Sequence, residues 1–174
     1  MSFRLRMSFM LVMMTALLFG FMHLINVNSN IYDFERLHIF LFNLCCGATI
    51  LIYHTEKQKT LSFMGQCFFV LSMAFGVMAF LKFYIAAIVI AFLLFVIIES
   101  IRWKHFSVFP IQFFSAKYPI SEKFHHAALL CLSIGLLFSI AAIINEEFVT
   151  FVNLEMVQLN TFFLGFSFPI SLIT

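Results

Sequence analysis

Five long runs of apolar residues, each nearly free of charge, constrain this chain more than any other feature. They cover residues 7–25, 37–53, 61–80, 83–101 and 127–144. A helix that crosses a bilayer needs about 20 mostly apolar residues, and each run approaches that length. The apolar residues are continuous rather than alternating, so a membrane β-barrel has no support. We therefore predict an all-α, polytopic transmembrane helix bundle with five full helices.

The composition excludes the main classes of soluble protein. The chain has 63% hydrophobic and 10% charged residues, whereas an average soluble domain has about 45–50% and about 25%. A chain of 174 residues exposes too much surface to hide this apolar excess in one core. A cytosolic domain, a disordered chain and a disulfide-stapled secreted domain are therefore all disfavoured. We expect one transmembrane domain over residues 1–174, no soluble domain, a lipid bilayer as partner and no nucleic acid.

A shorter apolar segment runs from Thr161 to Thr174 and contains Pro169. It is too short to span, so we predict a partial sixth helix. A chain end at Thr174 would leave a carboxylate inside the apolar layer, which is strongly unfavourable. We therefore expect the natural chain to continue, with this sequence as the N-terminal part of a longer membrane protein. Its missing helices, or other membrane subunits, are the expected protein partners.

The third and fourth runs are separated only by Leu81 and Lys82. As one helix, residues 61–101 would be about 60 Å long, at 1.5 Å per residue, which is twice the thickness of the hydrocarbon layer. We therefore predict a tight hairpin near Lys82.

The distribution of basic residues predicts the orientation. Alternating loops place eight of the ten Lys and Arg residues on the side of the N-terminus, and only Arg36 and Lys82 on the other side. Lys and Arg concentrate on the cytoplasmic side, so the N-terminus is predicted to be cytoplasmic, in a bacterial cytoplasmic membrane. The longest connection, Glu99–His126, then lies inside the cell, and its aromatic and basic residues favour the headgroup layer.

Small residues recur at helical spacing in three of the predicted helices. Membrane helices approach closely at such positions, so we expect these faces to form the helix–helix contacts. The sets are Ala16, Gly20 and His23; Gly65, Ser72, Gly76 and Ala79; and Ala128, Cys131, Gly135, Ser139 and Ala142. The four cysteines form no CxxC pair, so we expect them to be small, buried apolar residues.

The histidines are the main candidates for chemistry, because ionisable groups at membrane depth are costly and often functional. Two predicted cofactor-binding pairs would hold haem or a metal: His23 with His38 at the outer side, and His54 with His125 at the inner side. Of the neighbours His125 and His126, we expect His125 to face the bundle. His38 shares a predicted polar face with Cys45, Thr49 and Tyr53, whereas His54 lies about 160° away on the helical wheel.

No motif for catalysis is present: the chain has no CxxCH or HExxH, no Ser/His/Asp set, no paired carboxylates and no Gly-rich phosphate loop. We therefore predict a multi-pass integral membrane protein or subunit with no self-evident catalytic site of its own. A haem- or metal-binding redox membrane protein is the first alternative. A transporter fragment is the second, and it is disfavoured because the charged residues lie near predicted helix ends or in loops.

Overall fold

The computed structural model describes residues 3–25, 34–58, 60–105, 119–145 and 148, and every long element among them is helical. Elements α2, η1 and α3 follow one another without a break and form one long helix, the second span. The helices are α1 (Phe3–Ile25), α2 (Phe34–Ile39), η1 (Phe40–Gly47), α3 (Ala48–Glu56), α4 (Phe63–Phe80), α5 (Tyr84–His105) and α6 (Ile120–Ile144).

Five of the described helical segments are long and apolar enough to cross a membrane, as the sequence predicted. The second span, Phe34–Glu56, is the most deeply packed, with 61% of its residues buried, against 11% in the apolar window Leu5–Met22 of α1. The exposed side chains of α1 are large and apolar, as suits a face toward lipid. The predicted sixth helix, residues 161–174, lies outside the described residues.

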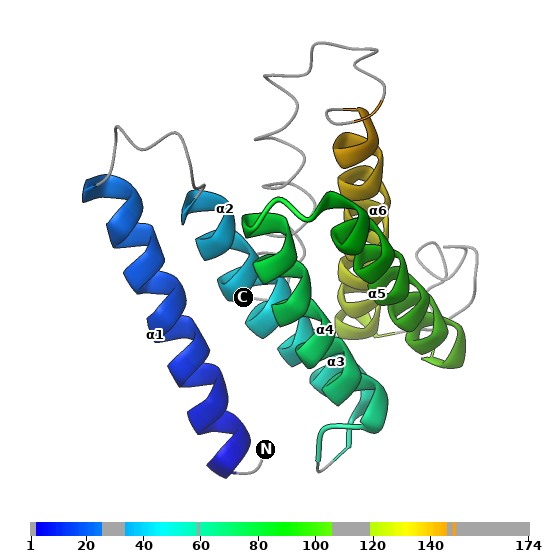
Figure 1. Ribbon diagram of the computed structural model, residues 1–174. Helices are drawn as coiled ribbons and strands as arrows, with labels where there is room; N and C mark the ends of the chain where they lie inside the picture. The colour runs from blue at the N-terminus through cyan, green and yellow to red at the C-terminus, as the bar shows by residue number, and fades with distance from the viewer. Residues whose placement is uncertain (1–2, 26–33, 59, 106–118, 146–147, 149–174) are drawn as a thin grey trace.

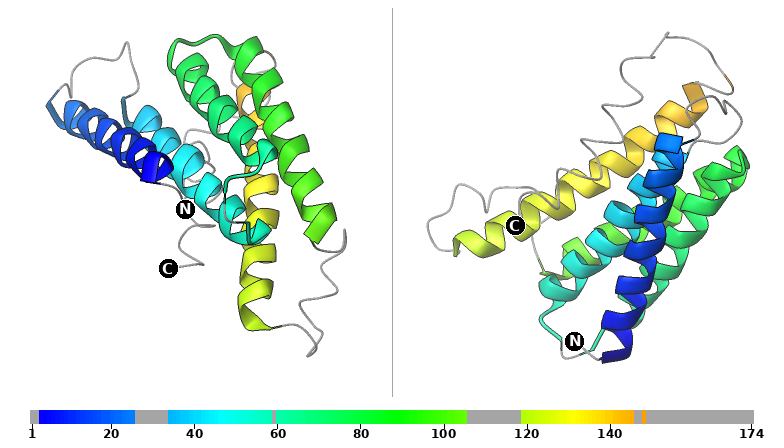
Figure 2. Two further views of the ribbon diagram at one scale, coloured as in Figure 1. Left: turned by 90° about the horizontal axis from the view of Figure 1, so that it is seen from below. Right: turned by 90° about the vertical axis from the view of Figure 1, so that its left-hand side faces the viewer.

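The spans alternate in direction, so that chain neighbours pack side by side (Figure 1). Helix α1 packs on α2 and η1, α4 packs on η1 and α5, and α6 packs on α5 and on α3. Figure 2 shows α6 inclined to the other spans, with α1 at the opposite side of the bundle. The second span is therefore the central element, and the core forms around Phe40, Phe68 and Phe75, which are fully buried.

The small-residue faces lie where the sequence placed them. Ala16, Ser72, Gly76 and Gly135 are buried in helix contacts. A Cβ built at Gly76 would lie 3.5 Å from the Cβ of Phe40, so the two backbones approach closely there. Small side chains thus let the helices approach closely. Inside a bilayer, this close packing rather than the hydrophobic effect holds helices together.

The predicted hairpin between the third and fourth spans is confirmed at Lys82. Lys82 has a φ of 61°, and its N–H donates to the carbonyl of Ala79. The N–H of Phe83 donates to the carbonyl of Met78, which completes a Schellman cap. The cap satisfies the last carbonyls of α4 and reverses the chain without glycine or proline.

An eight-residue π-helix, η1, interrupts the second span and was not predicted. Its last turn is closed by the N–H of Ala48, which donates to the carbonyl of Asn43. A π turn holds more residues than an α turn, so angles counted at 100° per residue do not carry through it. Cys45 and Thr49, two members of the predicted polar face, are fully buried. Cys46, the next residue after Cys45 and not a member of that face, is buried as well, so burial is not confined to one stripe of the helix.

Several helices extend further than their apolar runs, and two of these extensions shorten one connection. Helix α5 continues to His105 and α6 begins at Ile120, so the connection expected over Glu99–His126 is shorter than predicted. The prediction was wrong because it treated charged residues as loop, whereas pairing between charges allows them to remain helical. The central part of that connection, residues 106–118, lies outside the described residues.

Candidate functional sites

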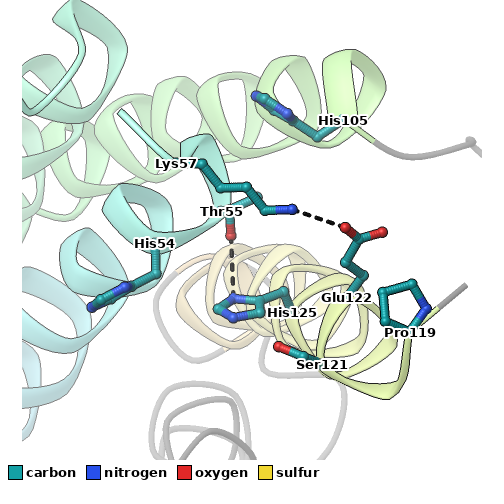
Figure 3. A pocket seen from close by; sticks show the side chains of 8 residues that line it. All are labelled: His54, Thr55, Lys57, His105, Pro119, Ser121, Glu122 and His125. Carbon is teal, nitrogen blue, oxygen red and sulfur yellow. Dashed lines mark hydrogen bonds and ion pairs between the residues drawn. The ribbon is translucent and has the colours of Figure 1, made fainter. Parts of the chain in front are cut away.

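The ends of three helices enclose a pocket of about 230 Å³ at the end of the bundle where α3 and α5 finish and α6 starts (Figure 3). Helix α3 stops because Lys57 adopts a left-handed conformation, with a φ of 51°. Helix α6 starts after Pro119, which is extended and provides no side-chain cap. The pocket residues that carry chemistry are His54, Lys57, His105, Ser121, Glu122 and His125.

Two contacts cross this pocket from α3 to α6. The Nζ of Lys57 lies 2.8 Å from Oε1 of Glu122, and Nδ1 of His125 lies 3.5 Å from Oγ1 of Thr55. The Thr55 hydroxyl donates its single proton to the carbonyl of Leu51, at 2.8 Å. Thr55 can therefore only accept from His125, so Nδ1 of His125 carries the proton and Nε2 is left for other partners.

The predicted inner pair, His54 and His125, shares this pocket, but the rings do not converge. The His54 ring packs edge-on against Tyr53 at 5.4 Å and points away from His125 in Figure 3. Ligand pockets for drug-sized molecules measure about 300–1,000 Å³, and this one is smaller. Across the part of the chain that the structure describes, no three His, Cys, Asp or Glu side chains are placed to hold a metal ion. The inner pair therefore shares one pocket without converging rings, and its role in binding haem or a metal stays a prediction.

The outer pair is described only in part. Nδ1 of His38 lies 2.7 Å from the carbonyl oxygen of Ala16, and a Cβ at Gly20 would lie 3.2 Å from the same nitrogen. A carbonyl can only accept, so Nδ1 donates and Nε2 of His38 keeps its lone pair. His23 is part of α1, but its side chain lies outside the described residues. The outer pair stays a prediction.

An ion pair within α5, which packs against α6, is the site that sequence reasoning missed. Nη1 of Arg102 lies 2.7 Å from Oε1 of Glu99, and the Ser133 hydroxyl donates to the same oxygen at 2.5 Å. The side chains of Arg102 and Glu99 are only 6% and 19% exposed. Glu99 lies six residues before the end of α5, about 9 Å along the helix axis. Its carboxylate therefore points into the bundle rather than into the headgroup layer.

His126 belongs to the same region and corrects the prediction about the two neighbouring histidines. It is 1% exposed, whereas His125 is only half-buried. Its ring lies within electrostatic range of Arg102 and Glu99. His125 faces α3, as the prediction requires, but His126 faces α5 and was missed. Helix α6 packs on two partners, so its buried face is wider than its small-residue stripe.

The cysteines are free, and the two in the central helix are fully buried. Cys45 directs its thiol toward the carbonyl of Phe69, at 3.7 Å, and Cys46 toward that of Phe9, at 3.9 Å. These two residues thus contact α4 and α1 and fill the core as predicted.

No protein-family model, curated protein or solved structure matches this chain. Function must therefore be argued from the two groups of polar residues: the open pocket at the helix ends and the buried ion pair.

Proposed function

We propose that the chain is a multi-pass integral membrane protein or subunit, with a cytoplasmic N-terminus and without a catalytic centre in the described helices. The observation that carries this proposal is the distribution of charge over the alternating spans. Arg6, Lys57 and Lys123 share one end of the bundle with Arg102 and Lys104, whereas the opposite end has Arg36 and Lys82. The positive-inside rule assigns the basic end to the cytoplasm.

Cysteine labelling tests the orientation. We would place single cysteines at Gln58 and at Lys82, in a background whose four native cysteines are changed to alanine. Both positions are exposed and lie next to helix ends, at opposite ends of the bundle. An impermeant maleimide should label the Lys82→Cys variant in intact cells, and the Gln58→Cys variant only after permeabilisation. The reverse pattern would refute the proposed orientation.

Proton or ion movement is the second candidate function, because Arg102 and His126 are buried between two spans and the Glu99 side chain, paired with Arg102, is only 19% exposed. Ionisable groups placed in this way inside a bundle are functional candidates by default. Purified protein in liposomes should dissipate an imposed pH gradient faster than a Glu99→Gln variant inserted to the same level. Equal rates for the two proteins would argue against this candidate.

Haem or metal binding in a redox membrane protein is the third candidate, and the geometry of His38 supports it. A histidine whose Nδ1–H donates to a backbone carbonyl presents Nε2 in the form that metals bind. A Soret band in the reduced-minus-oxidised spectrum of the purified protein should disappear in a His38→Ala variant and persist in a His105→Ala control. Absence of any such band from the wild-type protein would reject haem binding. Metal analysis of the purified protein would then test whether it binds a metal ion instead.

A further inference from the structure

We propose that the pocket between the ends of α3, α5 and α6 binds a phosphate group, either from an anionic phospholipid headgroup or as free phosphate. Its size of about 230 Å³ suits a group smaller than a drug-sized ligand. Binding of a lipid headgroup requires the bundle to lie in a membrane, whereas binding of free phosphate does not. It does not depend on which end faces the cytoplasm.

Lys57 is the principal anion-binding group. Its ammonium has three N–H donors, and the ion pair with Glu122 uses one of them. The Lys57 side chain is 73% exposed at the pocket, so a phosphate can reach the remaining donors without entering the bundle. The left-handed conformation of Lys57 directs the chain away from α3 at this point, and Figure 3 shows its side chain extending toward the start of α6.

The start of α6 supplies further donors on the other side of the pocket. The N–H groups of Ile120 and Ser121 open the helix without a side-chain cap from Pro119, whereas the N–H groups of Glu122 and Lys123 donate to the carbonyl of Pro119. Such N–H groups bind phosphate readily. The Ser121 hydroxyl lines the same pocket and is a further donor. Donors from α3 and α6 therefore face one volume.

Glu122 opposes anion binding, and this opposition gives the proposal a distinctive test. Its carboxylate neutralises Lys57 and lines the pocket. A phosphate must therefore compete with Glu122 for the lysine. Removing the charge of Glu122 should strengthen phosphate binding, although it removes an ion pair from the protein.

The pocket lies at the depth expected for headgroups. Trp103, two residues before His105, is 64% exposed, and Trp is enriched at membrane–water interfaces. Lys104 and Lys123 flank the pocket on α5 and α6 without lining it. Basic pockets between membrane helices at such a depth bind phosphorylated headgroups.

Native mass spectrometry of the protein released from nanodiscs tests the lipid form. The nanodiscs would contain equal amounts of phosphatidylglycerol and phosphatidylcholine. Wild-type protein should retain phosphatidylglycerol preferentially, and Lys57→Gln should reduce that retention about fivefold, the effect of one basic group near the surface. Lys104→Gln, a matched loss of charge outside the pocket, should change it less than twofold. Glu122→Gln should increase retention, and Lys57→Arg should restore it.

Inorganic phosphate distinguishes the two sources. If millimolar phosphate raises the melting temperature of the wild-type protein but not of Lys57→Gln, while lipid retention is equal in both, free phosphate is the ligand. If only lipid retention differs, the headgroup is the ligand. The proposal is overturned if Lys57→Gln and Lys104→Gln behave alike in both measurements, or if Glu122→Gln weakens binding. Lys57→Arg keeps the positive charge and Glu122→Gln keeps the shape of the side chain, so these two variants test the proposal even if Lys57→Gln folds poorly.

Discussion

Two ion pairs of similar geometry occupy opposite environments in this bundle. The N–O distance is 2.7 Å between Arg102 and Glu99 and 2.8 Å between Lys57 and Glu122. The first pair is 6% and 19% exposed, and the second is 73% and 35% exposed. Distance alone therefore says little about how much each pair contributes. The environment decides which pair the fold depends on and which is available to a ligand.

The physical reason is desolvation. A buried charge that loses its partner cannot recover its hydration, so breaking a buried pair is far more costly than the net contribution of the intact pair. An exposed pair exchanges its partner for water at little cost. The buried pair should therefore behave as a structural element, and the exposed pair as an adjustable one.

The largest effect is expected for Glu99→Gln. The change keeps the shape but removes the carboxylate from buried Arg102 and from the Ser133 hydroxyl, so the free energy of unfolding should fall by about 3–5 kcal/mol. Unfolding by sodium dodecyl sulfate in mixed micelles, followed by circular dichroism, measures this loss. The double variant Glu99→Leu with Arg102→Leu removes both charges and should be much closer to wild type in stability. A Glu99→Gln variant as stable as wild type would contradict the contrast between the two pairs.

A smaller effect is expected for Ser133→Ala. The hydroxyl donates to a charged acceptor in a buried site, and losing such a hydrogen bond should cost about 1.5–3 kcal/mol. Ser100→Ala is the matched control, because the Ser100 hydroxyl donates to the carbonyl of Val96 within its own helix and is exposed. We expect the control to lie within about 0.5 kcal/mol of wild type in the same unfolding assay. Equal losses for both variants would show that the buried carboxylate does not depend on Ser133.

The smallest effect on stability is expected for Glu122→Gln. An exposed pair contributes about 0.2–1 kcal/mol, and salt should reduce that contribution further. The unfolding free energy of wild type and variant should therefore converge between low and high salt. If Glu122→Gln costs as much as Glu99→Gln, the pocket is a structural element rather than an open site.

The spans could be predicted from the sequence because the signal for them is local. A run of about 20 apolar residues predicts a spanning helix whatever surrounds it. Small residues at helical spacing around Gly76 in α4, and around Gly135 in α6, predict the faces that pack. The hairpin at Lys82 followed from length alone, because no single helix of that length fits a bilayer. Each of these inferences needs only one segment of the chain.

The two polar sites were harder to predict from the sequence, because each is formed by segments that lie far apart in the chain. Glu99 is buried only because Ser133 and His126 of α6 lie against it, and nothing in the sequence near Glu99 indicates that contact. His54 and His125 line one pocket, but their predicted role as a cofactor-binding pair stays a prediction, and Lys57 and Glu122 were treated as loop charges. Counting angles on a wheel also failed where η1 departs from α-helical spacing.

The π-helix gives the second span room for one residue more than an α-helix of the same rotation would hold. Deleting one residue within Phe40–Gly47 should therefore return this stretch to α-helical spacing and leave Thr55 facing His125. Deleting one residue from the first turn of α3 would instead turn Thr55 by about 100° relative to His38. The π-helix is thus the place where this span can lose a residue and still keep its two ends aligned.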